Sequence, residues 1–429
     1  MVKHVISRCI ACLTAILLLI NITGCSPRIE ISQADHTENV KNLEMWKFRS
    51  NKEDYVISRW VKQWNEENPG IQVNFEVIPY NDYLTNRLPT AFATNSAPDI
   101  YMISAGSFLK YAKAGYMLPL DDFISDGLRK DLNPQSLEIA TYNKKVLGIP
   151  IEREPVALYY NKKVFERQHL KPPNTWSELE SCAKTVQSDA ISGICLPTQI
   201  NDYQNFIFYT FLMQTTGSTD SYMAATQFGT RGAKALSLWR NLAKYNYTQE
   251  TSVQIPSDIY PFATEKSAMQ ICGFWAVRML EKYYPDLEYG IVPVPHPDGG
   301  SSVSVYGGWY QAVNSNSRFA QDAVKFTLWM WGEDTSRPLE WCTEASSKVP
   351  ARKSVIDNNR DIFYKGKNTF FMQEVMSRSI PEPRYSVEIS STISKALQDA
   401  MYSDKKIDDI AKFAEDQIHG YIGGESQIF

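Results

Sequence analysis

From residue 43 onward, the chain alternates between a two-residue and a roughly 3.6-residue hydrophobic period. Leu43–Phe48, Ile71–Ile78 and Asp99–Ile103 have the period and residue types of strands. Between them, Tyr55–Glu67 and the segment around Tyr83–Thr94 carry apolar residues at helical spacing. This order of strand, helix, strand, helix and strand predicts a mostly parallel sheet with helices on both faces.

The first residues follow a different pattern, that of an export segment. Lys3 and Arg8 precede an apolar run over Cys9–Ile22, which is long for a signal peptide and short for a membrane span. The run ends in Ile-Thr-Gly-Cys, with the cysteine at Cys25, and this stretch resembles a bacterial lipobox. An uncleaved N-terminal anchor with an incidental cysteine is the alternative.

The lipobox resemblance implies that residues 1–24 are a lipoprotein signal peptide and that the thiol of Cys25 is acylated. Residues 25–40 are polar and lack apolar periodicity, so we expect them to be a tether. The folded body is then expected on the extracellular face of the bacterial cytoplasmic membrane, anchored by lipid.

Composition excludes two classes of protein. The 429 residues carry a formal net charge of −4 and a pI near 5.9, whereas a nucleic-acid-binding protein has a basic footprint. With 24 Tyr, 19 Phe and 10 Trp, the chain is too aromatic to be disordered. Aromatic residues beyond the needs of a core often line binding clefts, so their number directs attention to a ligand site.

The cysteines and histidines provide no recognisable metal or catalytic spacing. Cys182, Cys195, Cys272 and Cys342 stand singly and are expected to be buried small hydrophobes, with a Cys182–Cys195 disulfide only weakly supported. The chain lacks GxSxG, HExxH, GxxxxGK[ST] and GxGxxG motifs, and its histidines show no metal spacing. We therefore expect binding without catalysis, no metal and no cofactor.

A series of short motifs, in order along nearly the whole chain after residue 40, resembles the family 1 extracellular solute-binding proteins of ABC importers. After the strand Leu43–Phe48, the motifs are Asn68-Pro69-Gly70-Ile71, Ala97-Pro98-Asp99-Ile100, Gly148-Ile149-Pro150, Leu158-Tyr159-Tyr160-Asn161-Lys162, Pro173-Asn174-Thr175-Trp176, Gly273-Phe274-Trp275, Gly290–Pro295, Gly307-Gly308-Trp309 and Pro350–Ser354. Each motif alone is weak, but the occurrence of all of them in the family's order along one chain makes the resemblance strong.

The resemblance implies a two-lobed, periplasmic-binding-protein-like α/β fold, with the ligand in a cleft between lobes joined by several crossing segments. We expect residues 41–153 and 304–362 in one lobe, and residues 154–303 and 363–429 in the other. Ile149–Glu154 and Val303–Gly308 are the expected hinges, since glycine tolerates the backbone angles that a crossing demands.

The first candidate ligand residues follow from sheet topology. Open α/β sheets bind ligands beyond the carboxyl ends of their strands. This rule selects the loops after the first and third strands, whose polar residues are Arg49, Ser50, Asn51, Ser104 and Ser107. Ordinary turn chemistry is the alternative for each of them. Asp99, beside Pro98 at a strand start, is instead expected to cap backbone.

A carbohydrate site requires aromatic plates for the C–H face of the sugar and polar groups for its hydroxyls. Trp275, in the Gly-x-Trp motif, is the strongest candidate for a stacking plate, followed by Trp309 and Tyr310. The resemblance implies a hydroxyl-binding carboxylate at Glu154. Less strongly supported candidates are Asn205, Tyr209, Arg352 and Arg384. Arginines near the cleft would suit an acidic sugar, and exposed ion pairs are the alternative.

The resulting hypothesis is a lipid-anchored, monomeric receptor that captures an oligosaccharide by hinge closure and delivers it to the permease subunits of an ABC importer. A cell-surface glycan-degrading enzyme and a sensor that feeds a two-component system are the alternatives.

Overall fold

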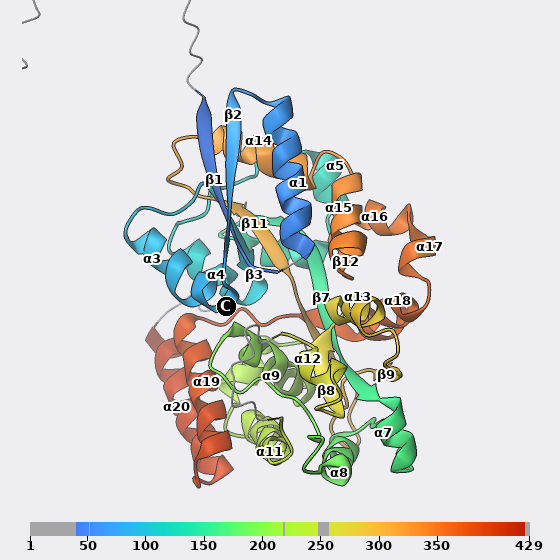
Figure 1. Cartoon of the computed structure of the whole chain (residues 1–429). Coiled ribbons are helices and arrows are strands. Elements are labelled where there is room, and N and C mark those ends of the chain that lie inside the picture. Colours follow the sequence, from blue (N-terminus) through green and yellow to red (C-terminus); the bar gives the residue numbers. More distant parts are fainter. Residues whose placement is uncertain (1–39, 51, 218, 248–256, 425–429) are drawn as a thin grey trace, which may run out of the picture. The chain divides into compact units, whose positions relative to one another are not determined.

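Two β-sheets organise the described part of the chain (Figure 1). The computed structural model describes residues 40–50, 52–217, 219–247 and 257–424. The predicted export segment and the tether up to residue 39, Cys25 included, lie outside these residues. Within them, no helix is both long and apolar enough to cross a membrane. The fold is the predicted two-lobed α/β arrangement, with one sheet in each lobe.

The sheet of the first lobe has the strand order β2-β1-β3-β11-β6. Its strands are β1 (Lys41–Phe48), β2 (Ile71–Ile78), β3 (Ile100–Ser104), β6 (Ile149–Pro150) and β11 (Trp309–Val313). The predicted βαβαβ start is confirmed, because β1 pairs in parallel with both β2 and β3. β11 runs antiparallel to β3 and β6, since the chain enters this strand from the second lobe.

Helices flank this sheet because their apolar stripes match its faces. The longest, α1 (Lys52–Glu67), buries Trp60 and Trp64 at helical spacing. The remaining helices are α2 (Tyr80–Asp82), a π-helical turn (Tyr83–Arg87), α3 (Leu88–Ala93), α4 (Ala105–Lys113), α5 (Asp126–Asp131), α6 (Pro134–Ile139), α14 (Ala320–Trp331), α15 (Ser336–Glu340), a second π-helical turn (Trp341–Ala345), α16 (Lys353–Asp357) and α17 (Arg360–Phe363). A two-stranded hairpin comprises β4 (Thr141–Tyr142) and β5 (Lys145–Val146).

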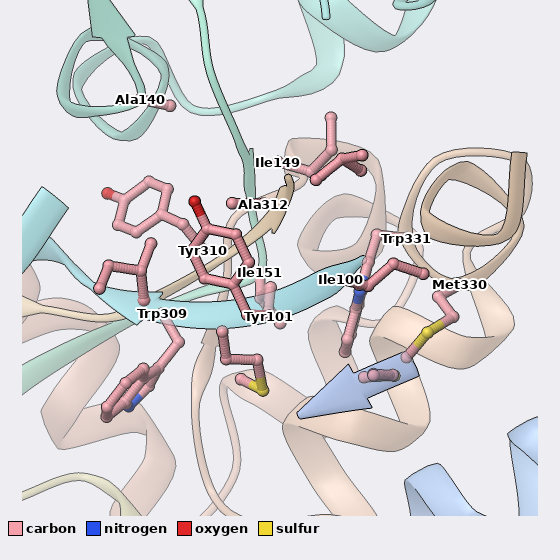
Figure 2. Close-up of a cluster of buried hydrophobic side chains, with 14 of the residues drawn as sticks. Ile100, Tyr101, Ala140, Ile149, Ile151, Trp309, Tyr310, Ala312, Met330 and Trp331 are labelled. Carbon is pink, nitrogen blue, oxygen red and sulfur yellow. The ribbon is translucent and has the colours of Figure 1, made fainter. Parts of the chain in front are cut away.

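The core of this lobe forms where β3, β11 and β6 meet α14. Figure 2 shows Ile100, Ile149 and Ala312 gathered with Trp331 in this buried cluster. Trp331 also donates from Nε1 to Gln311 Oε1 at 3.2 Å, so its one polar atom is satisfied inside the core. The packing of these strands against α14 fixes the loops at their ends.

The second sheet is built around the long strand β7 (Glu152–Asn161). Its partners are β8 (Met269–Gly273), β9 (Tyr289–Val292), β10 (Ser304–Gly307) and β12 (Val349–Pro350), and β13 (Ser379–Pro381) pairs with β10. The helices and helical turns are α7 (Lys162–Arg167), α8 (Trp176–Val186), α9 (Asp202–Gln214), α10 (Ser221–Thr226), α11 (Arg231–Ala243), α12 (Tyr260–Ala263), α13 (Trp275–Tyr283), α18 (Lys367–Phe370), a π-helical turn (Phe371–Val375), a 3-10 turn (Met376–Arg378), α19 (Val387–Tyr402) and α20 (Ile407–Gly424).

The chain changes between these two sheets three times; the third change lies between β11 and β12, and the first two points lie side by side. It passes from β6 to β7 through Ile151, and it returns from β10 to β11 through Gly308. The Ile151 N–H donates to the Trp309 carbonyl at 3.0 Å, so the crossings are joined by backbone. Both points fall within the segments predicted as hinges, whereas the predicted lobe boundaries stay a prediction.

Three local expectations can be compared directly with the structure. The predicted Tyr83–Thr94 helix divides into a π-helical turn followed by α3. Asp99 caps backbone as predicted, because its carboxylate accepts from the Glu44 N–H at 2.8 Å. Cys182, Cys195, Cys272 and Cys342 are all free thiols, so the weakly supported Cys182–Cys195 disulfide is absent.

Gly308 provides a test of how tightly the crossings approach each other. Its φ is +141°, and a Cβ there would lie 2.4 Å from the Glu152 carbonyl oxygen. Gly308→Ala should therefore lower the free energy of unfolding by at least about 2 kcal/mol, through backbone strain and this clash. Urea denaturation followed by tryptophan fluorescence measures the change.

Gly420→Ala is the matched control, because Gly420 lies in α20 with nothing within 4 Å of the added methyl. Alanine favours helix, so this variant should be more stable by about 0.4–1 kcal/mol. Equal stability of Gly308→Ala and the wild type would contradict the close approach of the crossings.

Candidate functional site

A cavity of about 550 Å³ lies between the lobes and receives residues from both. The loops after β1 and β3 contribute Arg49, Ser50 and Ser104, as the topological rule predicts. From the second lobe, α9 contributes residues of its first two turns, α13 contributes residues along its whole length, and the crossing contributes Gly307 and Gly308. This volume is within the range of about 300–1,000 Å³ that is usual for small-molecule sites.

One aromatic wall comes from the first lobe. Trp309 packs on Phe48 with ring centroids 4.1 Å apart, and Tyr80 meets Phe48 edge to face at 5.2 Å. All three line the cavity, although Trp309 is only 7% exposed. Their mutual packing holds the wall rigid, because each ring is fixed by at least one other.

A second aromatic group comes from the other lobe and centres on Trp275, the first residue of α13. Its indole Nε1 donates to the Ser257 carbonyl at 3.2 Å, and its ring meets Tyr203 edge to face at 6.3 Å. The ring also covers Gly273, where an added Cβ would lie 1.7 Å from it. Gly273 and Trp275 of the Gly-Phe-Trp motif therefore act together, since only glycine leaves room for this indole orientation.

Beneath the cavity, a buried lysine lies within 4 Å of three carboxyl groups from two segments, α1 and β7. Lys348 Nζ lies 2.6 Å from Glu154 Oε1, 3.1 Å from Glu53 Oε1 and 3.4 Å from Glu152 Oε1. Lys47, which is fully buried, adds a second cation 3.3 Å from Glu53 Oε2. The Trp341 Nε1–H donates to Glu152 Oε2. The cluster ties α1 to the start of β7 and to the segment before β12.

The protonation of this cluster follows from its burial and its excess of carboxylates. Burial and the neighbouring Glu154 and Glu53 raise the pKa of Glu152 to about 8, against the opposing charge of Lys348. Burial also raises the pKa of Glu154. For Glu53, burial is outweighed by Lys348 and Lys47, which lower its pKa to about 2. Glu53 is thus ionised at neutral pH, and Glu152 holds a proton.

A polar contact joins the lobes at the edge of the cavity. The Ser107 hydroxyl, on α4, donates to Asp202 Oδ2, on α9, at 2.5 Å. Beside it, Glu382 approaches α4 so closely that a Cβ on Gly106 would lie 2.5 Å from Oε1. Burial and the neighbouring Asp202 raise the pKa of Glu382 well above its usual range. This carboxyl can therefore donate a proton to a hydrogen bond at neutral pH.

Six of the predicted ligand residues line the cavity: Arg49, Ser50, Ser104, Glu154, Trp275 and Trp309. Their roles differ, since Glu154 is paired with Lys348, and Ser104 caps α4 by accepting from the Ser107 N–H. Asn51 lies outside the described residues.

Four further predicted residues do not line the cavity, because other contacts hold them. Ser107 is engaged with Asp202. Asn205 is directed to α19, where its Nδ2 donates to the Ser390 carbonyl at 3.2 Å, and the Tyr209 hydroxyl meets Ser390 Oγ at 3.3 Å. Tyr310 is 1% exposed, because alternate residues of β11 face opposite sides of the sheet.

The two predicted arginines also have structural partners outside the cavity. Arg352 Nε donates to Asp131 Oδ2 at 2.7 Å, and its Nη1 donates to the Asp334 carbonyl at 2.6 Å. Arg384 donates to the Ile139 and Thr141 carbonyls at 3.0 and 3.1 Å. Both guanidinium groups bind backbone oxygens left free at chain turns, which explains why arginine is used there.

Several residues that line the cavity were not predicted from the sequence. Arg278, Met279 and Lys282 follow Trp275 at spacings of three, four and seven residues, so one face of α13 lines the cavity. Helical spacing from the Gly-Phe-Trp motif could have identified them. Lys348 and Glu382 had no such signal, because long-range packing brings both to the site. Within the described ranges, no group of acidic, histidine or cysteine side chains could hold a metal ion.

Comparison with known proteins agrees with this geometry. The sequence model of a family described as bacterial extracellular solute-binding protein matches residues 50–335. A binding protein of Brucella abortus (strain 2308) is 26% identical over 273 residues, which are 62% of this chain and 65% of that protein. The chain therefore spans slightly less than two thirds of that relative's length.

Two other similarities extend the comparison. The multiple sugar-binding protein of Streptococcus mutans is 22% identical over 323 residues, or 72% of this chain and 75% of that protein. Among solved structures, the GacH receptor of Streptomyces glaucescens, studied without ligand and with acarbose, has a TM-score of 0.76. It is 21% identical, and the match covers 90% of this chain and 98% of that chain, which shows a shared fold.

The raised pKa of Glu152 yields a pH-dependent prediction for stability. The ordinary pKa of a glutamate is 4.5, and that of Glu152 in the folded chain is about 8. Between these two pH values, the folded chain keeps a proton on Glu152 that the unfolded chain has lost. The contribution of Glu152 to stability therefore falls as the pH rises through this window. Glu152→Gln cannot titrate. Its free energy of unfolding, relative to that of the wild type, should therefore rise by about 1–3 kcal/mol as the pH is raised from about 5 to about 8. Urea denaturation across this range measures the difference.

Glu53→Gln is the control, because a pKa of about 2 leaves Glu53 ionised in both folded and unfolded chains over that range. It should cost about 3 kcal/mol, by breaking a buried pair, with a weaker dependence on pH than Glu152→Gln, because Glu152 still titrates and loses only the repulsion from Glu53. A constant difference between Glu152→Gln and the wild type from pH 5 to 8 would show that Glu152 is ionised in the folded protein.

Proposed function

The chain belongs to the bacterial extracellular solute-binding protein family, and from this membership we propose that it is a carbohydrate receptor. In this proposal, an oligosaccharide occupies the cavity between the lobes, and contacts to both lobes stabilise the closed arrangement. The receptor then delivers the sugar to the permease subunits of an ABC importer.

The observation that carries the proposal is the supply of aromatic walls by both lobes. The C–H faces of pyranose rings pack on aromatic rings. Trp275 offers an aromatic ring from the second lobe, and the Trp309–Phe48–Tyr80 group offers rings from the first. Polar groups near these walls match the hydroxyl rim, among them Ser50 and Glu382. The sugar-binding name of the Streptococcus mutans relative is consistent with this chemistry.

The same proposal places the receptor on the outer face of the cytoplasmic membrane, held by a lipid on Cys25. Its support is the lipobox-like sequence that ends at this cysteine, together with the polar segment that follows it. A tethered receptor remains near its permease, which raises the local concentration of captured ligand.

Isothermal titration of the purified body, residues 40–429, against neutral and acidic oligosaccharides tests the ligand class. Binding of an oligosaccharide with release of no shorter product supports a receptor. If amino acids or peptides bind and no sugar does, the proposed ligand class is wrong. Shorter products after incubation would instead indicate a glycan-degrading enzyme.

Trp275 and Trp60 give a matched pair of tryptophan variants. Trp275→Ala should weaken sugar binding by about 1–3 kcal/mol, because a large aromatic face is lost from the cavity. Trp60→Ala should instead cost about 3–5 kcal/mol of stability, since Trp60 is 2% exposed and packs on Trp331. Thermal melting and titration of both variants separate the two effects. A Trp275→Ala protein that melts far below the wild type and binds sugar normally would refute the stacking role.

The lipid anchor is tested in a bacterial host that carries the lipoprotein pathway. Full-length wild-type protein should sediment with membranes and incorporate radiolabelled palmitate, because acylation of the Cys25 thiol supplies the attachment. Cys25→Ala should incorporate none, whereas Cys12→Ala, in the same export segment, should be labelled normally. Equal labelling of wild type and Cys25→Ala would rule out this anchor.

A further inference from the structure

The cavity contains cationic side chains from both lobes that are not engaged in ion pairs. Lys52 opens α1 of the first lobe, while Arg278 and Lys282 lie on the cavity face of α13 in the second. Among the described residues, none of the three has a carboxylate within 4 Å, and Arg49, also at the cavity, has none either. The fully buried cations Lys47 and Lys348, in contrast, are paired with carboxylates.

The three cations are close enough to disfavour one another. Burial lowers the pKa of Lys52, and repulsion from Arg278 and Lys282 lowers it further, while Glu344 acts weakly in the opposite direction. Bringing like charges together across a cleft costs electrostatic free energy unless an anion lies between them. The arrangement is therefore unfavourable for an empty cavity and favourable for an anionic ligand.

Arg278 supplies a second, independent indication. Its Nε is buried and has no hydrogen-bond partner among the described residues, although guanidinium N–H groups shielded from water are normally paired. Its Nη atoms are not shielded in this way and have no hydrogen-bond partner among the described residues, so they are the part of this fork-shaped group that a carboxylate or sulfate in the cavity would contact.

The carboxylates that line the same cavity offset these cations only in part, because Glu53 and Glu154 have a cation partner of their own and Asp202 and Asp258 have hydrogen-bond partners only. Glu53 and Glu154 are paired with Lys348. Asp202 accepts from Ser107, and Asp258 accepts from the Tyr260 N–H at 3.0 Å. Burial and Asp202 raise the pKa of Glu382, which leaves this carboxyl protonated. Among the described lining residues, the cations without an ion-pair partner (Arg49, Lys52, Arg278 and Lys282) therefore outnumber the carboxylates without one (Asp202 and Asp258).

We propose that Lys52, Arg278 and Lys282 form a subsite for an anionic sugar unit, a uronic acid or a sulfated residue, in the bound oligosaccharide. Lys282 and the neighbouring Tyr283 are exposed, so this part of the cavity opens to solvent and suits the end of a chain rather than its middle. The aromatic walls then hold the neutral units. The inference rests on the proposed carbohydrate function and narrows its substrate class.

Isothermal titration with matched trisaccharides tests the subsite. Neutral gluco-, xylo- and manno-configured trisaccharides are each compared with the counterpart that ends in the corresponding uronic acid, and with the neutral trisaccharide bearing one terminal sulfate. Charge-assisted hydrogen bonds predict that at least one anionic form binds roughly 10- to 100-fold more tightly than its neutral partner. The two anionic arms distinguish carboxylate from sulfate recognition.

The triple variant Lys52→Gln, Arg278→Gln, Lys282→Gln should lose this preference. The matched control is Lys184→Gln, Lys234→Gln, Arg318→Gln, which neutralises three exposed cations outside the cavity and should retain it. For wild-type protein, raising the salt from about 0.05 to about 0.5 M should weaken anionic ligands severalfold and leave neutral ones almost unchanged. This salt test does not depend on the folding of any variant.

Each outcome has a defined reading. Preference for the anionic form, lost in the triple variant and in high salt, supports the subsite. If neutral trisaccharides bind as tightly as their anionic counterparts or more tightly, the subsite is refuted while the carbohydrate receptor stands. If no trisaccharide of either class binds, the carbohydrate function fails, and the subsite fails with it.

Discussion

The neutralisation of buried carboxylates by Lys348 is the interaction on which the site depends. Glu53 belongs to α1, Glu152 and Glu154 begin β7, and Lys348 precedes β12, so one ammonium group joins segments far apart in the sequence. Removing such a cation would leave carboxylates buried and unpaired, which is far more costly than losing a surface ion pair. The floor of the cavity is thereby fixed to both lobes.

The two aromatic groups above this floor are held in place by different contacts. The aromatic wall of Phe48, Tyr80 and Trp309 is packed into the first lobe, whereas Trp275 is held by one hydrogen bond and by its contact with Gly273. The lobes are joined by three passages of the chain, by the Ser107–Asp202 contact and by the hydrogen bonds from Arg384 to the Ile139 and Thr141 carbonyls. Each lobe presents an aromatic group to the cavity between them.

The balance of charge around the cavity separates structural from ligand-directed groups. Cations that hold the fold, such as Lys47, Lys348 and Arg352, are saturated by carboxylates or carbonyls. Lys52, Arg278 and Lys282 face the cavity without such partners among the described residues. The proposed anionic ligand would supply the opposite charge that these partly exposed cations lack.

The amino-acid sequence alone determined the fold class, the parallel β1–β2–β3 start, the loops that reach the cavity and the role of Asp99, because these follow from local periodicity and strand order. It also identified Trp275 and Glu154 through short motifs. Tertiary structure decided which side chains face the cavity. Tyr310 is buried on the other side of the sheet from the cavity. Arg352 and Arg384 donate hydrogen bonds to backbone carbonyls. Lys348 and Glu382 line the cavity although they lie far along the chain from its other residues. Side-chain direction and ion pairing depend on contacts between residues hundreds of positions apart, which no local pattern encodes.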